Sequence, residues 1–387
     1  MIKNEIELRK FVSPELVFGV DSRFLAGRYA KNFGARKALV VTDQGVIAAG
    51  WTKHVTDSLK SEGILYEVFS GVSPNPRAEE VMQGEELYNS YGCNIIIAVG
   101  GGSPIDCAKG IGIVSSNKQH ILKFEGIDKV LIPMPPLICV PTTGGTSADV
   151  SQFDIITDYN NKVKIAIISK TLVPDVTLVD PVTLSTMDSY LTACTGIDAL
   201  VHAIEAFVSN ASSPITDMHA LEAIRLLSKN LLPSIAELDN IELRSNMMLG
   251  SLEAGLAFSN ASLGCIHAMA HSLGGVLDLP HGECNAILLR HGIRFNFEKA
   301  VEKYEAIGKA MNIDLRGMNV KEKGKAILKE IDRLRTKAGV NKKLSQKGIS
   351  IADIPKLAKN AIKDACMATN PRHANKRDIE VIYEEAL

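Results

Sequence analysis

The sequence lacks the features that mark several classes of protein. Its 43 Lys and Arg residues balance 44 Asp and Glu residues, the formal net charge is −1, and no basic run stands out. We therefore expect no nucleic-acid partner. No apolar stretch approaches the ~20 residues of a membrane span, and the opening MIKNEIELRKF has no apolar signal-peptide core. These absences predict a protein without a membrane segment.

Cysteine is also used sparingly. Seven cysteines are scattered along 387 residues, an odd number, and no CxxC pair occurs. This pattern predicts reduced thiols and a cytoplasmic setting, because disulfide frameworks and zinc ribbons need paired, regularly spaced cysteines. Internal repeats and low-complexity segments are absent, and the length allows two or three domains with full cores.

The first half of the chain alternates short β-rich runs with helical patterns, which is typical of parallel βαβ units. A hairpin is expected over residues 155–168, with its turn at 158–161. After Asp180 the β-branched runs stop, so we predict an α/β domain over residues 1–182 and an all-helical domain over 183–387. The predicted strands are 37–42, 65–69, 94–99, 137–140 and 176–179, and the predicted helices between them are 48–61, 79–91 and 108–114.

A glycine run lies where the third predicted strand meets a helix. It reads Gly100-Gly101-Gly102-Ser103, with Pro104 next. Glycines allow close backbone approach, and the free N–H groups of a helix start attract an anion, so this turn is suited to a phosphate. Ser103 is a good candidate N-cap, and Pro104 fits a first helical turn. The spacing is not GxGxxG, so the ordinary Rossmann fingerprint is not matched.

Two further strand ends carry polar side chains. Asp43 follows the first predicted strand, where a carboxylate can bind ribose hydroxyls and repel a 2′-phosphate, which favours NAD over NADP; a solvated turn is the alternative. Residues 141–147, PTTGGTS, form a second loop of hydroxyls and glycines. Two such loops predict a ligand crevice outside the carboxyl edge of a parallel sheet.

The second half has helical patterns throughout. Residues 191–208 are apolar or small on most faces, which predicts a central buried helix. On it Asp198 and His202 are four residues apart, and Glu205 is expected to be exposed, the alternative being a carboxylate that orients a ligand imidazole. Further helices are predicted at 216–228, 241–257, around His267 and His271, and at 299–311, 322–338, 354–367 and 377–386.

Three of the nine histidines fall in residues 264–281. His267 and His271 are four apart, so on a helix they share one face, roughly 6 Å apart at Cβ; His281 is expected in a turn. A lone buried histidine is ordinarily a core residue bonded to backbone, but three in an apolar setting favour a metal site. With Asp198 and His202 they suit Fe(II), Zn(II) or Mn(II). Spacing leaves open which of His267 and His271 is a ligand.

At this point the chain resembles the iron-dependent (group III, metal-containing) alcohol dehydrogenases. The motifs that carry the resemblance run nearly the whole length: GGGSPID at 100–106, PTTGGTS at 141–147, GIDALVHAIEA at 196–206, the 267–281 stretch and NPR at 370–372. The resemblance implies a dehydroquinate synthase-like architecture, with a Rossmann-like dinucleotide-binding domain of parallel strands and a helical metal-binding domain. It implies reversible hydride transfer between NAD(H) and a primary alcohol or aldehyde held at the metal.

The resemblance also assigns residues. The metal ligands are Asp198, His202, His267 and His281, with Fe(II) as the expected ion and Zn(II) as the alternative. His271 is an unligated histidine near the nicotinamide that takes part in proton movement, and Phe258 lines the substrate pocket. The cofactor contacts are Asp43, Gly100, Gly101, Gly102, Ser103, Asp106, Thr142, Thr143, Thr146 and Lys164. A homodimer, or a larger homo-oligomer, is the expected assembly.

One departure concerns the second loop, which in the family usually reads PTTAGTGSE and here reads PTTGGTSAD. Its length is kept, but Ser147, Ala148 and Asp149 change the side chains on the nicotinamide side and so bear on the substrate. Two other functions remain open: a glycerol or polyol dehydrogenase of the same superfamily, which uses fewer histidine ligands, and a nucleotide- and metal-binding protein without turnover.

Overall fold

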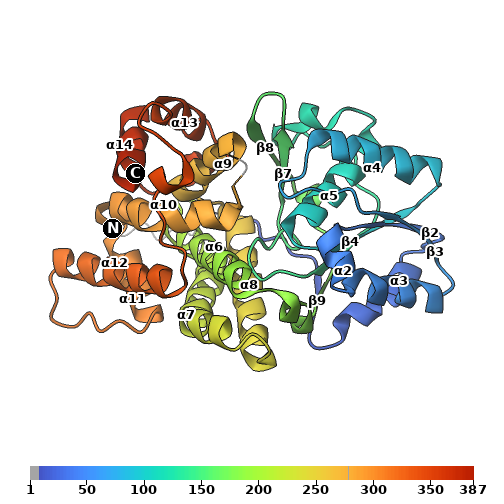
Figure 1. Cartoon of the computed structure of the whole chain (residues 1–387), viewed down its shortest axis with the longest axis horizontal. Helices are drawn as coiled ribbons and strands as arrows, with labels where there is room; N and C mark the ends of the chain where they lie inside the picture. Colours follow the sequence, from blue (N-terminus) through green and yellow to red (C-terminus); the bar gives the residue numbers. More distant parts are fainter. Residues whose placement is uncertain (1–7, 278) are drawn as a thin grey trace.

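The structure is a computed structural model that describes residues 8–277 and 279–387. The chain forms an α/β half and a helical half, side by side (Figure 1). A cavity lies where they meet. Residue 182, the predicted domain limit, falls in the 3₁₀ helix η4 (Pro181–Thr186) between the last strand of the main sheet and the first long helix. The exact division stays a prediction.

The α/β half is built on a six-stranded parallel sheet in the order β1-β9-β6-β4-β2-β3. The strands are β1 (Glu15–Phe18), β2 (Lys37–Val41), β3 (Leu65–Phe69), β4 (Ile95–Gly100), β6 (Leu137–Pro141) and β9 (Val176–Val179). Apart from β1, this is the doubly wound order 2-1-3-4-5, whose direction of winding changes between β2 and β4. The predicted Asp43 and glycine run follow these two strands and therefore flank the switch point.

Both faces of this sheet are covered. Leu39 and Val41 pack into a core under α4 (Ala78–Ser90) and α5 (Gly102–Asn117). Ala38 and Val40 pack into a second core under α1 (Ala26–Asn32) and α3 (Trp51–Ser61). Alternate side chains of a strand point to opposite faces, so two buried faces account for its unbroken apolar run.

The predicted hairpin is confirmed. β7 (Phe153–Asp158) pairs antiparallel with β8 (Val163–Ile168), and β5 (Gly126–Ile127) completes a second sheet in the order β5-β8-β7. In Figure 1 this hairpin stands at the junction of the two halves. It brings Lys164 to the cavity.

Several sequence predictions in this half need correction. The helix expected over 48–61 is α3, which begins only at Trp51 because Gly50 takes a left-handed φ of 86° as its N-cap; the short helix α2 (Gln44–Ala48) before it had not been predicted. Helix α5 begins at Gly102 with Gly101 as N-cap, so Ser103 lies in its first turn and is not the cap. Strand β1 had not been predicted.

The helical half is organised around α6 (Ser189–Val208), which packs against α7 (Pro214–Ala236), α8 (Ile241–Ala261) and α10 (His281–Asn296). Helix α10 had not been predicted: His281 is its first residue and not part of a turn. The other helices are α9 (Cys265–Leu277), α11 (Val301–Ala310), α12 (Val320–Lys337), α13 (Ile354–Ala361) and α14 (Lys376–Ala386). The helix predicted at 354–367 is α13 followed by the 3₁₀ helix η7 (Ala365–Thr369).

Helix α6 also corrects the statement that no stretch approaches the length of a membrane span. Within the described part of the chain it alone is long and apolar enough. Its residues are nevertheless buried in the helical core, and they include Asp198, His202 and Glu205. Its apolar character is that of a central core helix.

Candidate active site

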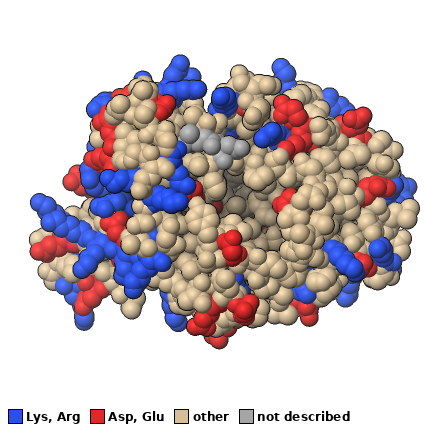
Figure 2. Space-filling model, in the orientation of Figure 1, with Lys and Arg blue, Asp and Glu red and all other residues tan. Residues whose placement is uncertain are grey.

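One cavity of about 110 Å³ lies between the two halves, and Figure 2 shows the surface hollowed there. Ten of the sixteen predicted site residues line it: Gly102, Ser103, Asp106, Thr146, Lys164, His202, Phe258, His267, His271 and His281. The other six are not among its lining residues: Asp43, Gly100, Gly101, Thr142, Thr143 and Asp198. Residues from both halves thus face one space.

On the α/β side the two predicted loops meet. A Cβ added to Gly101 would lie 3.0 Å from the Thr143 side chain, and one added to Gly102 would lie 2.9 Å from that of Thr146. A Cβ at residue 102 would be closer than real Cβ contacts come, and one at residue 101 would be tighter than most, so glycine at both positions favours this approach. The first residues of α5 therefore lie directly against the loop of residues 141–147.

A residue that had not been predicted joins this side. Asn75, in the loop before α4, takes a left-handed φ of 59° and lines the cavity. Its backbone N–H donates to Ser103 Oγ at 3.3 Å, and its Oδ1 accepts from Lys164 Nζ at 2.7 Å. It links the start of α5 to the β7–β8 hairpin. No motif in the sequence marks this asparagine.

Asp43 lies at the carboxyl end of β2 and caps α2. One of its oxygens, Oδ1, accepts from the backbone N–H of Val46 at 2.8 Å. This bond fixes the carboxylate and leaves Oδ2 for another donor. Its contact with a ribose remains a prediction.

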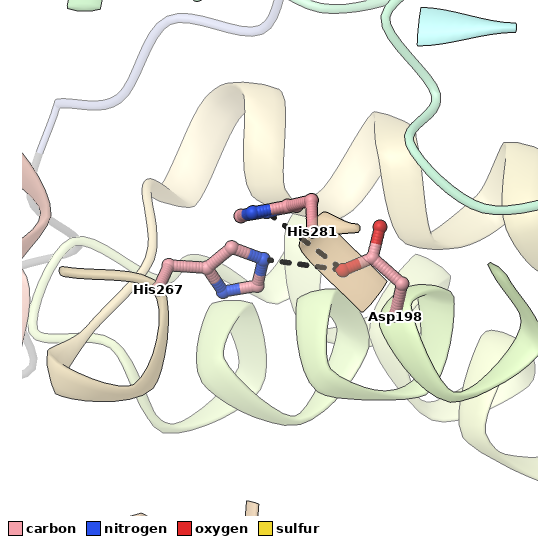
Figure 3. A group of neighbouring side chains, drawn as sticks. All are labelled: Asp198, His267 and His281. Carbon is pink, nitrogen blue, oxygen red and sulfur yellow. Dashed lines mark ion pairs between the residues drawn. The ribbon is translucent and has the colours of Figure 1, made fainter. Parts of the chain in front are cut away.

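On the helical side three predicted ligands converge. Asp198 of α6, His267 of α9 and His281 of α10 have ligand atoms within 4.8 Å of one another. Asp198 Oδ1 lies 3.9 Å from His267 Nε2 and 3.8 Å from His281 Nε2 (Figure 3). Three helices therefore deliver one carboxylate and two imidazoles to one point, and His267, not His271, is the histidine of α9 that faces Asp198.

His202 lies beside this group without joining it. Its ring is stacked between those of His267 and Phe258, with centroid distances of 4.4 and 4.3 Å. Its buried Nδ1 has no hydrogen-bond partner among the described residues. A buried nitrogen without a hydrogen-bond partner costs free energy, so this geometry is consistent with a further group, such as a metal ion, that binds the His202 ring. Its role as the fourth ligand remains a prediction.

Glu205 corrects an expectation, because it is buried and not exposed. Its Oε2 lies 2.7 Å from His267 Nδ1, and its Oε1 accepts from the backbone N–H of Ile266, also at 2.7 Å. Burial raises the pKa of Glu205 to about 7. In its ionised form the carboxylate accepts the Nδ1 proton and leaves the Nε2 lone pair directed at Asp198 and His281. Glu205 therefore sets the tautomer that a metal ligand needs.

Asn285 is a second residue that the sequence did not reveal. Its amide Nδ2 donates to Asp198 Oδ1 at 2.5 Å and lies 3.0 and 3.2 Å from the Nε2 atoms of His267 and His281. Its Oδ1 is buried without a partner among the described residues. It stands one helical turn after His281, so it was missed together with α10.

Burial shifts the pKa values of the candidate ligands His202, His267 and Asp198. Burial lowers the pKa of His202 to about 3 and holds the pKa of His267 well below its usual range, so both rings are neutral at physiological pH. Burial raises the pKa of Asp198 above its usual value. Neutral imidazoles and a carboxylate are the donors that a borderline divalent ion accepts. The donor set and the orphaned polar atoms fit such an ion.

Comparison with known proteins decides the family. The model "Iron-containing alcohol dehydrogenase" matches residues 13–181, and "Fe-containing alcohol dehydrogenase family, C-terminal" matches residues 192–387. The chain belongs to the iron-containing alcohol dehydrogenase family. It is an oxidoreductase of the class that acts on alcohols and aldehydes, and membership implies NAD and a divalent metal as cofactors.

Similar members of the iron-containing alcohol dehydrogenase family cover the whole fold. The chain is 39% identical to 1,3-propanediol dehydrogenase of Citrobacter freundii over 95% of this chain and 96% of that one. It is 33% identical to the NAD-dependent methanol dehydrogenase of Bacillus methanolicus, over 97% and 99%. A crystal structure of 1,3-propanediol oxidoreductase superposes with a TM-score of 0.96 at 37% identity, covering 98% of this chain and 100% of that one.

Proposed function

We propose that this protein catalyses reversible hydride transfer between small primary alcohols or aldehydes and NAD(H), with one Fe(II) ion per chain. The observation that carries the proposal is the convergence of Asp198, His267 and His281 at the cavity that Gly102, Ser103 and Thr146 also line; the two histidines lie on its wall. A divalent ion bound by these groups polarises an oxygen and lowers the pKa of a bound hydroxyl. His202 completes the ligand set in this proposal.

The cofactor lies across the carboxyl edge of the sheet in this proposal. The N–H groups at the start of α5 hold the pyrophosphate, supported by Thr142, Thr143 and Thr146. The free oxygen of Asp43 holds the adenosine ribose and disfavours a 2′-phosphate, which gives NAD over NADP. The nicotinamide end then faces Lys164 and the histidines across the cavity.

His271 receives the alcohol proton in this proposal. It lines the same cavity as the metal ligands but is itself outside the group around Asp198. Phe258, with Phe153 at a centroid distance of 5.7 Å, gives the substrate end an apolar wall that excludes water. We therefore assign proton transfer to His271 and shape selection to Phe258.

The ion, the assembly and the location are also part of the proposal. Zn(II) outbinds Fe(II) on nitrogen and oxygen ligands in general, so Fe(II) occupancy depends on the metal supplied. We propose a homodimer in the cytoplasm.

The test is NAD-dependent oxidation of ethanol, butan-1-ol, 1,3-propanediol and glycerol by metal-stripped protein refilled with Fe(II) or Zn(II). Formation of NADH with one metal and a primary alcohol is the expected result. Preference for glycerol would instead favour the polyol dehydrogenase. Folded protein that binds NAD but gives no NADH with any alcohol and metal would contradict the proposal and favour a binding protein without turnover.

A further inference from the structure

His271 forms part of the wall between two cavities. On one side it faces the cavity that holds the metal ligands. On the other side it lines a second cavity of about 150 Å³ between the β7–β8 hairpin and α13, together with Asp364, Lys162 and Lys363. The orientation of this one ring therefore decides which nitrogen faces the cavity of the metal ligands and which faces the second cavity.

Asp364 fixes that orientation. Its Oδ2 lies 2.8 Å from His271 Nδ1, and both side chains are largely buried. The His271 ring is also held flat against that of His281, with 5.2 Å between the centroids and 17° between the planes. Within the described part of the chain no hydrogen bond is formed by Nε2 of His271. One nitrogen is thus committed to a carboxylate and the other is available to the cavity.

We propose that Asp364 is a positioning residue that acts through His271. It accepts the Nδ1 proton and so keeps the Nε2 lone pair facing the alcohol. Burial alone would raise the pKa of Asp364, but His271 and the Cys366 backbone N–H hold that pKa at about 2, so the carboxylate is ionised and acts only as an acceptor. The inference rests on the proposed role of His271 in proton movement.

The second bond of Asp364 makes Asp364→Asn a selective test. Oδ1 of Asp364 accepts the backbone N–H of Cys366 at 2.8 Å and caps η7. Asparagine caps as well as aspartate, and to keep this bond it must turn its NH₂ group toward His271. The NH₂ group can only donate, so His271 Nδ1 becomes the acceptor and the proton moves to Nε2. The cap is retained while the tautomer is inverted.

A metal held by His271, Asp364 and Cys366 is the competing account, since their ligand atoms also lie within 4.8 Å of one another. Metal analysis separates the two accounts. Positioning predicts one ion per chain in both the parent and Asp364→Asn. A second ion that is lost in Asp364→Asn would overturn the proposal.

The experiment compares Asp364→Asn with the parent and with Asp353→Asn. Asp353 is a partly exposed aspartate at the start of α13 whose Oδ2 accepts from the backbone N–H of Ser350. For Asp364→Asn we expect kcat to fall on the order of 10²-fold, the usual contribution of general acid–base catalysis, with KM for NAD within about twofold and an unchanged melting temperature. Asp353→Asn should leave all three unchanged. Asp364→Glu, which restores the carboxylate, should recover part of the rate.

A readout that needs no turnover is the ¹⁵N spectrum of histidine-labelled protein. The His271 signals, assigned by their absence in His271→Ala, should change tautomer in Asp364→Asn and not in Asp353→Asn. An unchanged tautomer with kcat within about twofold of the parent would overturn the inference. If the parent oxidises no alcohol, the proposed function fails, and this spectrum still tests the role of Asp364.

Discussion

Two buried polar clusters of this molecule use the same residue types for different ends. In the helical half, the ligand cluster (Asp198, Glu205, His267, His281 and Asn285) directs its donor atoms at one point. In the α/β half, the tether cluster (Lys109 and Asp154) is fully buried, but among the described residues no hydrogen bond or ion pair joins the two side chains. Lys109 Nζ donates to the backbone oxygens of Ser151 and Phe153, at 2.9 and 2.8 Å.

The difference lies in what satisfies the charges. Neither carboxylate oxygen of Asp154 has a hydrogen-bond partner among the described residues, although the side chain is fully buried. Lys109 lies on α5, and its hydrogen bonds to two backbone oxygens hold the segment that carries Phe153 against that helix. Buried titratable groups therefore occur both in the ligand cluster and in the tether cluster, and the ligand cluster differs in that its donor atoms point at one place.

The largest effect expected is from His267→Ala compared with His271→Ala. The first removes a ligand from the cluster, so we expect bound metal and turnover to be lost together. The second removes a group outside the cluster, so metal should be retained while kcat falls. Metal analysis and NADH formation measure the two quantities. Turnover without metal in His267→Ala would contradict the role of His267 as a metal ligand. Loss of metal in His271→Ala would show that His271 is itself a ligand.

A smaller effect is expected from Glu205→Gln. The amide no longer fixes the Nδ1 proton of His267, and loss of such a supporting carboxylate typically weakens metal binding 10–100-fold. Competition with a chelator measures the affinity.

Glu253→Gln is the matched control, because Glu253 of α8 pairs with His219 of α7 at 2.5 Å, and neither residue belongs to the ligand cluster. It should leave metal affinity unchanged. Equal weakening in both variants would show that the loss comes from the fold and not from the ligand cluster.

The smallest effect is expected from Asp154→Asn, and it depends on pH. Burial raises the pKa of Asp154 well above its usual value, so the unfolded chain ionises first as pH rises. The free energy of unfolding then falls as pH increases above about 4, the pKa of a free aspartate. Asparagine does not ionise, so the variant should match the parent near pH 4 and exceed it at pH 8, on the order of 1–3 kcal/mol.

Denaturant unfolding at the two pH values measures this prediction, with the exposed Asp239→Asn as control. A parent whose stability is independent of pH, or a variant no more stable at pH 8, would show that Asp154 is satisfied in the folded chain.

The sequence predicted most elements whose pattern is local. Buried parallel strands were found from apolar runs, and the hairpin from its turn. β1 was missed because ELVF is a short edge strand that forms only by pairing with β9, far along the chain. α10 was missed because the glycine and polar residues after His281 hid its pattern, and Asn285 was missed with it.

For the site, spacing placed His267 and His271 on one helical face but did not decide which faces Asp198. That decision depends on how α9 packs against α6, and on Glu205, which was expected to be exposed. The sequence-based resemblance chose His267, and the structure places that ring in the cluster. Asp364 lies 93 residues from His271, so no local pattern relates them.

The most direct test of the account is anomalous diffraction at the iron or zinc edge from crystals of the refilled protein. The account predicts one peak per chain, between Asp198 Oδ1, His267 Nε2 and His281 Nε2 and within reach of His202. A peak at His271, Asp364 and Cys366, or no peak in protein that turns over, would contradict it.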